Sequence, residues 1–315
     1  MLRNIRGTRA NPPGIAAEDP ERRAIYGAAL EQFEQLLNAS RGTPPPARPL
    51  PLFYALSQAG RAIVAARGDS PRIDGHGLSQ DRQQPQPSEL LHRKIKRTPS
   101  RSGTDAFGAV SRAIGSPDIQ GAIEIGALWV ALPGTHRVPE DAWRESWRTA
   151  LSVLDETNNQ AVQLGMTVVR AISFSGNPYF NEMEALAGRY PLIPHDARIR
   201  PLPGNANMSP GNWGLAIAWK ATGPLEAVAY MDPSEPNGSR YLVPTLPGQE
   251  TVLNPLMMWW TLLFGLSIFA RYEPELWMEV LNVERSPLAV PMESMLQQAL
   301  VAIPALLHEE LLVKA

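Results

Sequence analysis

Residues 255–270 read PLMMWWTLLFGLSIFA and run directly into Arg271, Tyr272 and Glu273. Apolar side chains occupy every face of a helix built from this stretch, which is typical of a helix buried in a protein core. The stretch is too short to span a bilayer, because a membrane-spanning helix needs about 20 apolar residues. We therefore expect a central core helix and no membrane partner. Its last turn brings charged side chains to the edge of the core, where they need partners.

The composition indicates a globular protein. Of the 315 residues, 44% are hydrophobic and 19% are charged. The chain has no cysteine, which excludes disulfides, thiolate nucleophiles and cysteine-based metal sites. The five histidines are widely spaced and no Gly-rich phosphate or dinucleotide motif is present, so we expect no metal and no cofactor. No apolar segment follows the N-terminal arginines as it would in a secretory signal, and we expect a cytoplasmic protein.

Helical periodicity dominates both ends of the chain. Asp19, Pro20 and Glu21 form a typical helix start, with an N-cap, a proline in the first turn and an acidic side chain. The apolar stripe of this first helix and the further helices follow the same 3.6-residue period. The stripe of the first helix is Ile25, Ala29, Phe33 and Leu37. Further helices are expected over 52–66, over 255–271, near 274–282 and from Pro291 onward. Residues 138–141 are expected to open another helix, whose stripe is Trp143, Trp147, Leu151 and Leu154.

In the middle of the chain the period changes to two. Apolar and small residues alternate over 166–174 and 213–220, and 225–231 and 240–246 are further strand candidates. Strands that follow one another across short turns favour an antiparallel sheet.

The fold class that these patterns predict is α+β, mainly α-helical. We expect the N- and C-terminal helices to pack together, with a small antiparallel sheet inserted in the middle. We expect an N-terminal helical region (1–160), a small β region (161–250) and C-terminal helices (251–315) that pack back on the first region to form one compact body.

Residues 79–105 are polar, rich in proline and locally basic, and we expect a flexible loop there. Its centre holds four cations that could contact the phosphates of a nucleic acid: Arg93, Lys94, Lys96 and Arg97. A solvated loop without a ligand is the alternative. Residues 1–115 carry 17 Lys and Arg against 10 Asp and Glu, whereas the rest carries 12 against 21. This asymmetry indicates either an anion-binding half or two halves that attract each other.

Two short motifs stand far apart in the chain. The first is FYALSQAGRA at 53–62, followed by GHGL at 75–78, and the second runs from LSIFARYEP at 266–274 to Trp277. In these motifs and in their order the chain resembles the YaaC-like family of bacteria, whose members are largely uncharacterised. The resemblance covers most of the chain.

The first motif is also similar to the second helix of HEPN-type helical domains, because Tyr54, Ala59 and Arg61 precede a glycine-flanked His76. Many HEPN domains are ribonucleases. This resemblance implies an RNA- or nucleotide-binding domain in a toxin or defence setting. The alternative is a non-catalytic interaction or scaffold protein that binds another protein or self-associates as a homo-oligomer. The sequence leaves open whether the protein is an enzyme.

The two motifs supply the candidate polar site, which consists of Arg61, His76, Arg271, Tyr272 and Glu273. Glycines on both sides of His76 permit a tight turn, and positive charge is favoured at the C-terminal end of the core helix. We predict that His76 lies near Arg271 and Tyr272, between the N-terminal helices and the tail. The alternatives are a buried ion pair for Arg61 and a helix-capping role for His76.

Overall fold

The computed structural model describes residues 1–81, 90–133, 135, 189–190 and 241–313, together with the backbone of the strands between 151 and 240. The chain begins with the short helix α1 (Leu2–Gly7) and the 3₁₀ turn η1 (Gly14–Ala17). The long helix α2 (Pro20–Gly42) follows, then the turn η2 (Pro45–Ala47) and the helix α3 (Pro49–Arg67).

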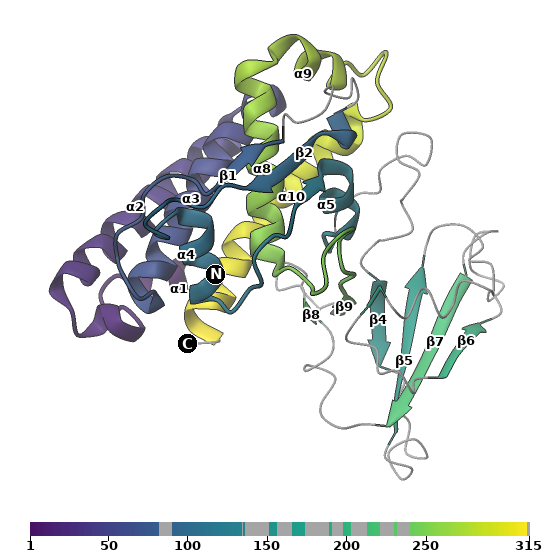
Figure 1. The fold of residues 1–315 in the computed structure, drawn as a ribbon, viewed down its shortest axis with the longest axis horizontal. Helices are drawn as coiled ribbons and strands as arrows, with labels where there is room; N and C mark the ends of the chain where they lie inside the picture. Colours follow the sequence, from purple (N-terminus) through teal and green to yellow (C-terminus); the bar gives the residue numbers. More distant parts are fainter. Residues whose placement is uncertain are drawn as a thin grey trace.

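The start of α2 is the one that its sequence predicts. The carboxylate of Asp19 accepts hydrogen bonds from the backbone N–H groups of Glu21 and Arg22, which satisfies donors that have no partner inside the helix. Phe33 and Leu37 of the predicted stripe are fully buried. Helices α2 and α3 pack along each other and form one side of the helical part (Figure 1).

A three-stranded antiparallel sheet follows α3. Its strands are β1 (Leu78–Gln80), β2 (Lys94–Arg97) and β3 (Ala122–Glu124), in the order β1-β2-β3. The turn η3 (Leu90–His92) precedes β2, and the helices α4 (Ala106–Ala113) and α5 (Ile125–Ala131) flank β3 in the chain.

The prediction of a flexible loop over 79–105 is corrected by this sheet. Residues 94–97 form its central strand, and Ile95 in the middle of that strand is fully buried. Its backbone pairs with Gln80 on one side and Ile123 on the other. The pairing strands come from other parts of the chain, so the local polarity of 93–97 gave no sign of them. Residues 82–89 of the predicted loop lie outside the described residues.

A second antiparallel sheet has six strands in the order β6-β7-β5-β4-β9-β8. They are β4 (Leu151–Asp155), β5 (Met166–Ser173), β6 (Arg198–Leu202), β7 (Trp213–Lys220), β8 (Tyr230–Met231) and β9 (Arg240–Leu242). The strands predicted at 166–174 and 213–220 pair with each other as β5 and β7.

One sequence interpretation is wrong in this region. Leu151 and Leu154 were expected on a helix, whereas both belong to strand β4, which pairs with β5 and β9. A segment as short as Leu151–Asp155 fits either period, and here the pairing of the backbone decides. The first part of the predicted helix lies outside the described residues.

The C-terminal part holds α8 (Pro255–Tyr272), α9 (Pro274–Val280) and α10 (Ala289–His308), which ends in a π turn (Glu309–Val313). Helix α8 is buried over most of its length and packs against α3, α5 and α10, so helices from both ends of the chain surround it (Figure 1). The approach to α3 is close, because a Cβ atom on Gly60 would lie 2.4 Å from the Trp260 ring. The predicted fold class, mainly helical α+β with an antiparallel sheet in the middle and terminal helices packed together, is confirmed.

Within the described residues, one segment, Ala289–Leu312, is long and apolar enough to cross a membrane by length and composition alone. Most of this segment is buried inside the protein, including Met292, Met295 and Leu296. Such burial is typical of the core helix of a soluble protein.

Candidate functional site

His76 occupies a tight turn that is bonded to the start of α4. The flanking residues Gly75 and Gly77 have φ angles of 72° and 78°, a region that side chains with a Cβ rarely adopt. The backbone N–H of Ala106 donates to the carbonyl of Gly75 (3.1 Å), and that of Phe107 donates to the carbonyl of His76 (3.2 Å). The fold therefore fixes the position of the His76 backbone.

A buried ion pair supports this turn from below. Arg97 of β2 donates to Asp105 at 2.9 Å, donates to the carbonyl of Gly77 and also pairs with the more exposed Asp118. Asp105 caps α4 by accepting a hydrogen bond from the backbone N–H of Gly108. Burial alone would raise the pKa of Asp105, but the hydrogen bonds from Gly108 and Arg97 more than offset it. The pKa lies below its ordinary value of 3.8.

The His76 ring rests on the aromatic core. Its centroid lies 5.6 Å from the Phe53 ring on α3 and 6.0 Å from the Phe264 ring on α8. The residue as a whole is exposed, but these contacts remove water from part of the ring. This desolvation lowers the pKa of His76 below 6.5, and the positive charges of Arg271 and Arg61 lower it further. His76 is therefore predominantly neutral at pH 7.

The two arginines that act on His76 belong to different helices. Arg61 is an exposed residue of α3, and Arg271 lies in the last turn of α8. Arg271 donates from Nε to the carbonyl of Ser267 (3.0 Å), and its guanidinium lies 5.0 Å from the centre of the Tyr272 ring. Among the described residues, neither arginine forms an ion pair with a carboxylate. Both guanidinium groups thus keep donors that can face a ligand.

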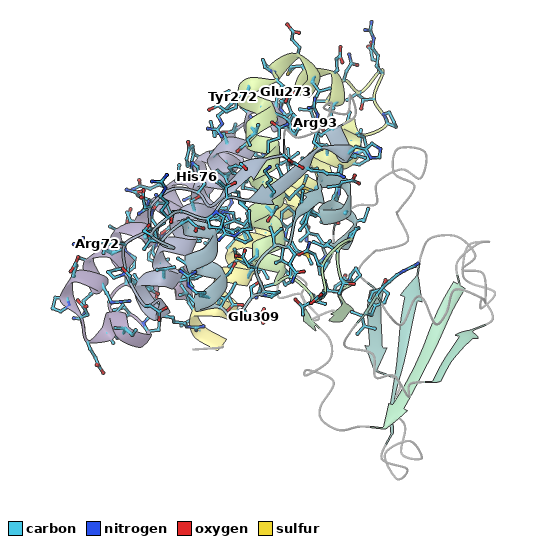
Figure 2. The ribbon with its side chains drawn as sticks, viewed as in Figure 1. Arg72, His76, Arg93, Tyr272, Glu273 and Glu309 are labelled. Atoms are coloured by element: carbon cyan, nitrogen blue, oxygen red, sulfur yellow. The ribbon has the colours of Figure 1, made fainter. Side chains whose placement is uncertain are left out.

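Glu273 points to a different partner. Its carboxylate accepts from the guanidinium of Arg93 at 2.9 Å, and Arg93 is buried with its charge 5.6 Å from the centre of the Phe269 ring. Figure 2 shows this pair near the junction of α8 and α9, with Tyr272 on the outside and His76 farther along the molecule. Arg61 and Arg271 thus both act on His76 through their charges, whereas Glu273 pairs with Arg93, the residue before β2.

The other basic candidates also have carboxylate partners. Lys94 pairs with Glu124 of the neighbouring strand at 3.4 Å, and Lys96 pairs with Asp81 at 3.0 Å. Arg97 forms the buried pair described above. A phosphate that approached β2 would have to compete with these carboxylates.

Tyr54 lies on the same helix as Arg61 and is not among the site residues predicted from the sequence. It is exposed, and its ring lies 5.8 Å from that of Phe53. Tyr54, Gln58 and Arg61 follow at i, i+4 and i+7 and share one face of α3. This spacing was visible in the sequence and could have identified Tyr54. We call the surface formed by Tyr54, Arg61, His76, Arg271 and Tyr272 the His76 face.

The architecture defines a mainly helical α+β protein with an exposed cluster of arginine, histidine and tyrosine against its core helix. A family model described as YaaC-like Protein matches residues 11–311, nearly the whole chain, and the chain belongs to this family. The resemblance drawn from the two motifs is thereby confirmed. No curated protein and no solved structure matches the chain. The similarity to HEPN-type domains stays a prediction.

Proposed function

We propose that the His76 face binds nucleotides through their phosphate and base groups, either as free nucleotides or within single-stranded RNA. The observation that carries the proposal is the pair of arginines, Arg61 and Arg271, whose positive charges both act on the neutral His76 ring. Neither has a carboxylate partner among the described residues. Guanidinium groups bind phosphate oxygens through two parallel hydrogen bonds, and a neutral imidazole adds a donor without repelling them.

The aromatic side chains of the face support a nucleotide over a simple anion. Tyr272 is 70% exposed and Tyr54 is 39% exposed, so both present ring surface to solvent. Nucleobases stack on such rings in proteins that bind single strands. Tyr54 and Arg61 are two helical turns apart, about 10 Å along α3. Tyr272 therefore lies beside Arg271, and Tyr54 lies on the same face of α3 as Arg61.

The remaining candidates have a supporting role in this proposal. Glu273, Arg93, Lys94, Lys96 and Arg97 hold β2 and the end of α8 in place through their ion pairs. The toxin or defence setting and the cytoplasmic location that we expect from the sequence are compatible with an RNA ligand and belong to the same proposal.

Fluorescence anisotropy with a labelled single-stranded RNA of 12 nucleotides tests this function at several salt concentrations. Arg61→Gln and Arg271→Gln should each weaken binding roughly tenfold and reduce the slope of log K against log salt by about one. Tyr272→Leu should weaken binding with little change in that slope, because stacking involves no counterion release.

The exposed Arg101, which lies outside the His76 face, supplies the control Arg101→Gln. Competition by mononucleotides at similar concentration would identify free nucleotides as the ligand. Wild-type affinity in both arginine variants, or no binding at 50 mM salt, would refute the proposal.

A second candidate function is self-association through the end of α8 and the segment after it. Tyr272, Met278 and Val283 are large apolar residues that are at least half exposed there. Clustered exposure of this kind often marks protein interfaces. Light scattering during gel filtration would show a dimer for the wild-type protein and a monomer for Met278→Asp. A wild-type monomer at high concentration would exclude this candidate.

A further inference from the structure

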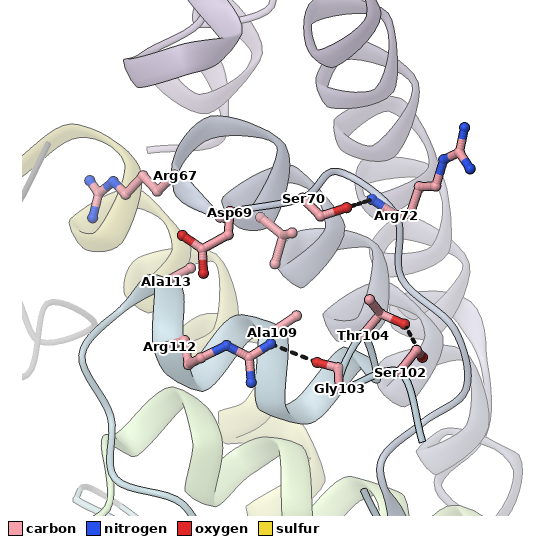
Figure 3. A pocket seen from close by; sticks show the side chains of 12 residues that line it. Arg67, Asp69, Ser70, Arg72, Ser102, Gly103, Thr104, Ala109, Arg112 and Ala113 are labelled. Carbon is pink, nitrogen blue, oxygen red and sulfur yellow. Dashed lines mark hydrogen bonds between the residues drawn. The ribbon is translucent and has the colours of Figure 1, made fainter. Parts of the chain in front are cut away.

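A cavity lies between the C-terminal end of α3 and α4, and the segments around residues 68–72 and 102–104 close it (Figure 3). Its volume is ≈ 200 Å³. It shares no lining residue with the His76 face, and no motif in the sequence pointed to it. Pockets for drug-sized molecules measure roughly 300–1,000 Å³, so this cavity suits a smaller molecule.

The lining divides into an apolar part and a polar part. Val64, Ala109 and Ala113 contribute methyl groups. Ser70, Ser102 and Thr104 contribute hydroxyl groups, and those of Ser102 and Thr104 are 2.6 Å apart and hydrogen-bonded to each other. A ligand with a short apolar group and a polar head would find partners for both.

Two of the charged lining residues are directed elsewhere. Arg67 donates to the backbone carbonyl of Glu310 and pairs with its carboxylate at 3.9 Å. In Figure 3 the guanidinium of Arg72 extends away from the cavity into solvent, and that of Arg67 extends away on the opposite side. The charge balance inside the cavity therefore depends on the other two charged residues.

Those two residues are Asp69 and Arg112. Arg112 donates one hydrogen bond, to the carbonyl of Gly103 at 2.7 Å, which leaves further N–H groups of its guanidinium for a ligand. Within the described residues, neither an ion pair nor a side-chain hydrogen bond engages the Asp69 carboxylate. Both residues are exposed, so the cavity offers one anionic and one cationic group at its rim, beside an apolar surface.

We propose that this cavity binds a small zwitterion of the α-amino acid class. The ammonium group of the ligand donates to Asp69, its carboxylate accepts from Arg112, and a short side chain packs on Val64, Ala109 and Ala113. The opposite charges of the ligand and of the two exposed residues match one for one, so each charged group of the ligand has a partner at the rim of the cavity.

Calorimetry and thermal unfolding of the full chain with glycine, alanine, serine and valine test this site. Propionate and ethylamine complete the series, because each keeps the carbon chain of alanine but lacks one of its charged groups. We expect alanine or serine to bind and to raise the melting temperature, since a ligand that binds only the folded state stabilises it. Propionate and ethylamine should bind at least tenfold more weakly.

Asp69→Asn and Arg112→Gln should each weaken amino acid binding at least tenfold, and Arg101→Gln serves as the matched control. The melting temperature of ligand-free Asp69→Asn should equal that of the wild-type protein, which separates loss of the site from loss of the fold. Failure of all four amino acids to bind would overturn the proposal. Equal binding of propionate, or full affinity in Asp69→Asn, would also overturn it. RNA binding by the His76 face is independent of every one of these outcomes.

Discussion

Arg97 of the central strand and Asp105 at the start of α4 form an almost completely buried ion pair of 2.9 Å. The pair joins β2 to α4 directly beneath the glycine that follows His76, and Arg97 donates to the carbonyl of that glycine. Strand, helix and turn therefore share one electrostatic contact. The position of the His76 ring depends on a pair to which His76 itself does not belong.

The first prediction concerns pH. Because the folded pKa of Asp105 lies below 3.8, its carboxylate stabilises the fold fully above about pH 4, and this contribution is lost as the pH falls through the folded pKa. Asp105→Asn should cost about 3 kcal/mol at pH 7, because Arg97 loses a buried partner, and should flatten the loss of stability between pH 5 and 3. Urea unfolding at several pH values measures the free energy of unfolding and its dependence on pH.

The half-exposed Asp118 gives the control Asp118→Asn, which should cost less than about 1 kcal/mol. An identical pH profile for Asp105→Asn and wild type would contradict the assignment.

A matched pair of glycine substitutions tests the turn. Gly75 and Gly77 both have positive φ, but a Cβ on Gly75 meets nothing within 4 Å, whereas one on Gly77 would lie 1.9 Å from Asp105 Oδ1. Gly75→Ala should therefore cost only the conformational term of about 1–2 kcal/mol. Gly77→Ala should cost clearly more, because it must displace the buried pair. Thermal unfolding ranks the stabilities of the two variants. An equal loss of stability would show that the Asp105 side chain can move aside at little energetic cost.

A second matched pair tests the contact between α3 and α8. A Cβ on Gly60 would overlap the Trp260 ring, whereas one on Gly27 of α2 meets nothing within 4 Å. Gly60→Ala should destabilise the protein by about 1–3 kcal/mol through overpacking. Gly27→Ala should stabilise it by roughly 0.5–1 kcal/mol, because alanine is the better helix former. Stabilisation by both substitutions would mean that α3 and α8 do not approach this closely.

Leu263 tests the central position of α8. Its side chain is fully buried, so Leu263→Asp places a carboxylate in the core without a partner. Proteins of this kind are stable by about 5–15 kcal/mol, and the substitution should remove several kcal/mol of this or prevent folding. Val301→Asp on the exposed side of α10 is the control and should change the melting temperature little. A soluble Leu263→Asp protein with an unchanged melting temperature would exclude a core position.

The titration of His76 tests the arrangement of the predicted site. Its pKa should lie below 6.5, and the fold should lose stability as the pH falls below that value, because the unfolded chain takes up the proton more readily. Removing a nearby positive charge should raise the pKa, more in Arg271→Gln than in Arg61→Gln. Proton NMR titration of the imidazole signal, assigned with His76→Gln, measures these values. If neither substitution moves the pKa, the arginines do not act on His76.

The sequence predicted those elements that one local pattern decides. The uninterrupted apolar stretch at 255–270 corresponds to α8, and Asp19 and Pro20 mark the start of α2. The alternation over 213–220 corresponds to β7. Each of these patterns lies within the segment whose structure it predicts, and the tertiary packing does not override it.

Strand β2 and the partners of the site residues could not be predicted in this way. Among residues 93–97 only Ile95 is apolar, so the segment carries no period of its own. Its charges are compensated by carboxylates from other segments, and Glu273 comes from 180 residues away to meet Arg93. Likewise, the glycines predicted a turn at His76, but the Phe53 and Phe264 rings beneath it follow from the packing of α3 on α8.

Helix α8 packs against segments that are synthesised long before it, so the core cannot form until α8 has been made. Helix α3 ends at Arg67 and α8 begins at Pro255, so the ribosome makes about 190 residues between them, which takes about 10 to 40 s. During that time the side of α3 around Gly60 is exposed to water, because Trp260 of α8, which later packs on it, has not yet been made. We therefore expect the nascent N-terminal half to bind chaperones that hold apolar surfaces, because the core can close only late in translation.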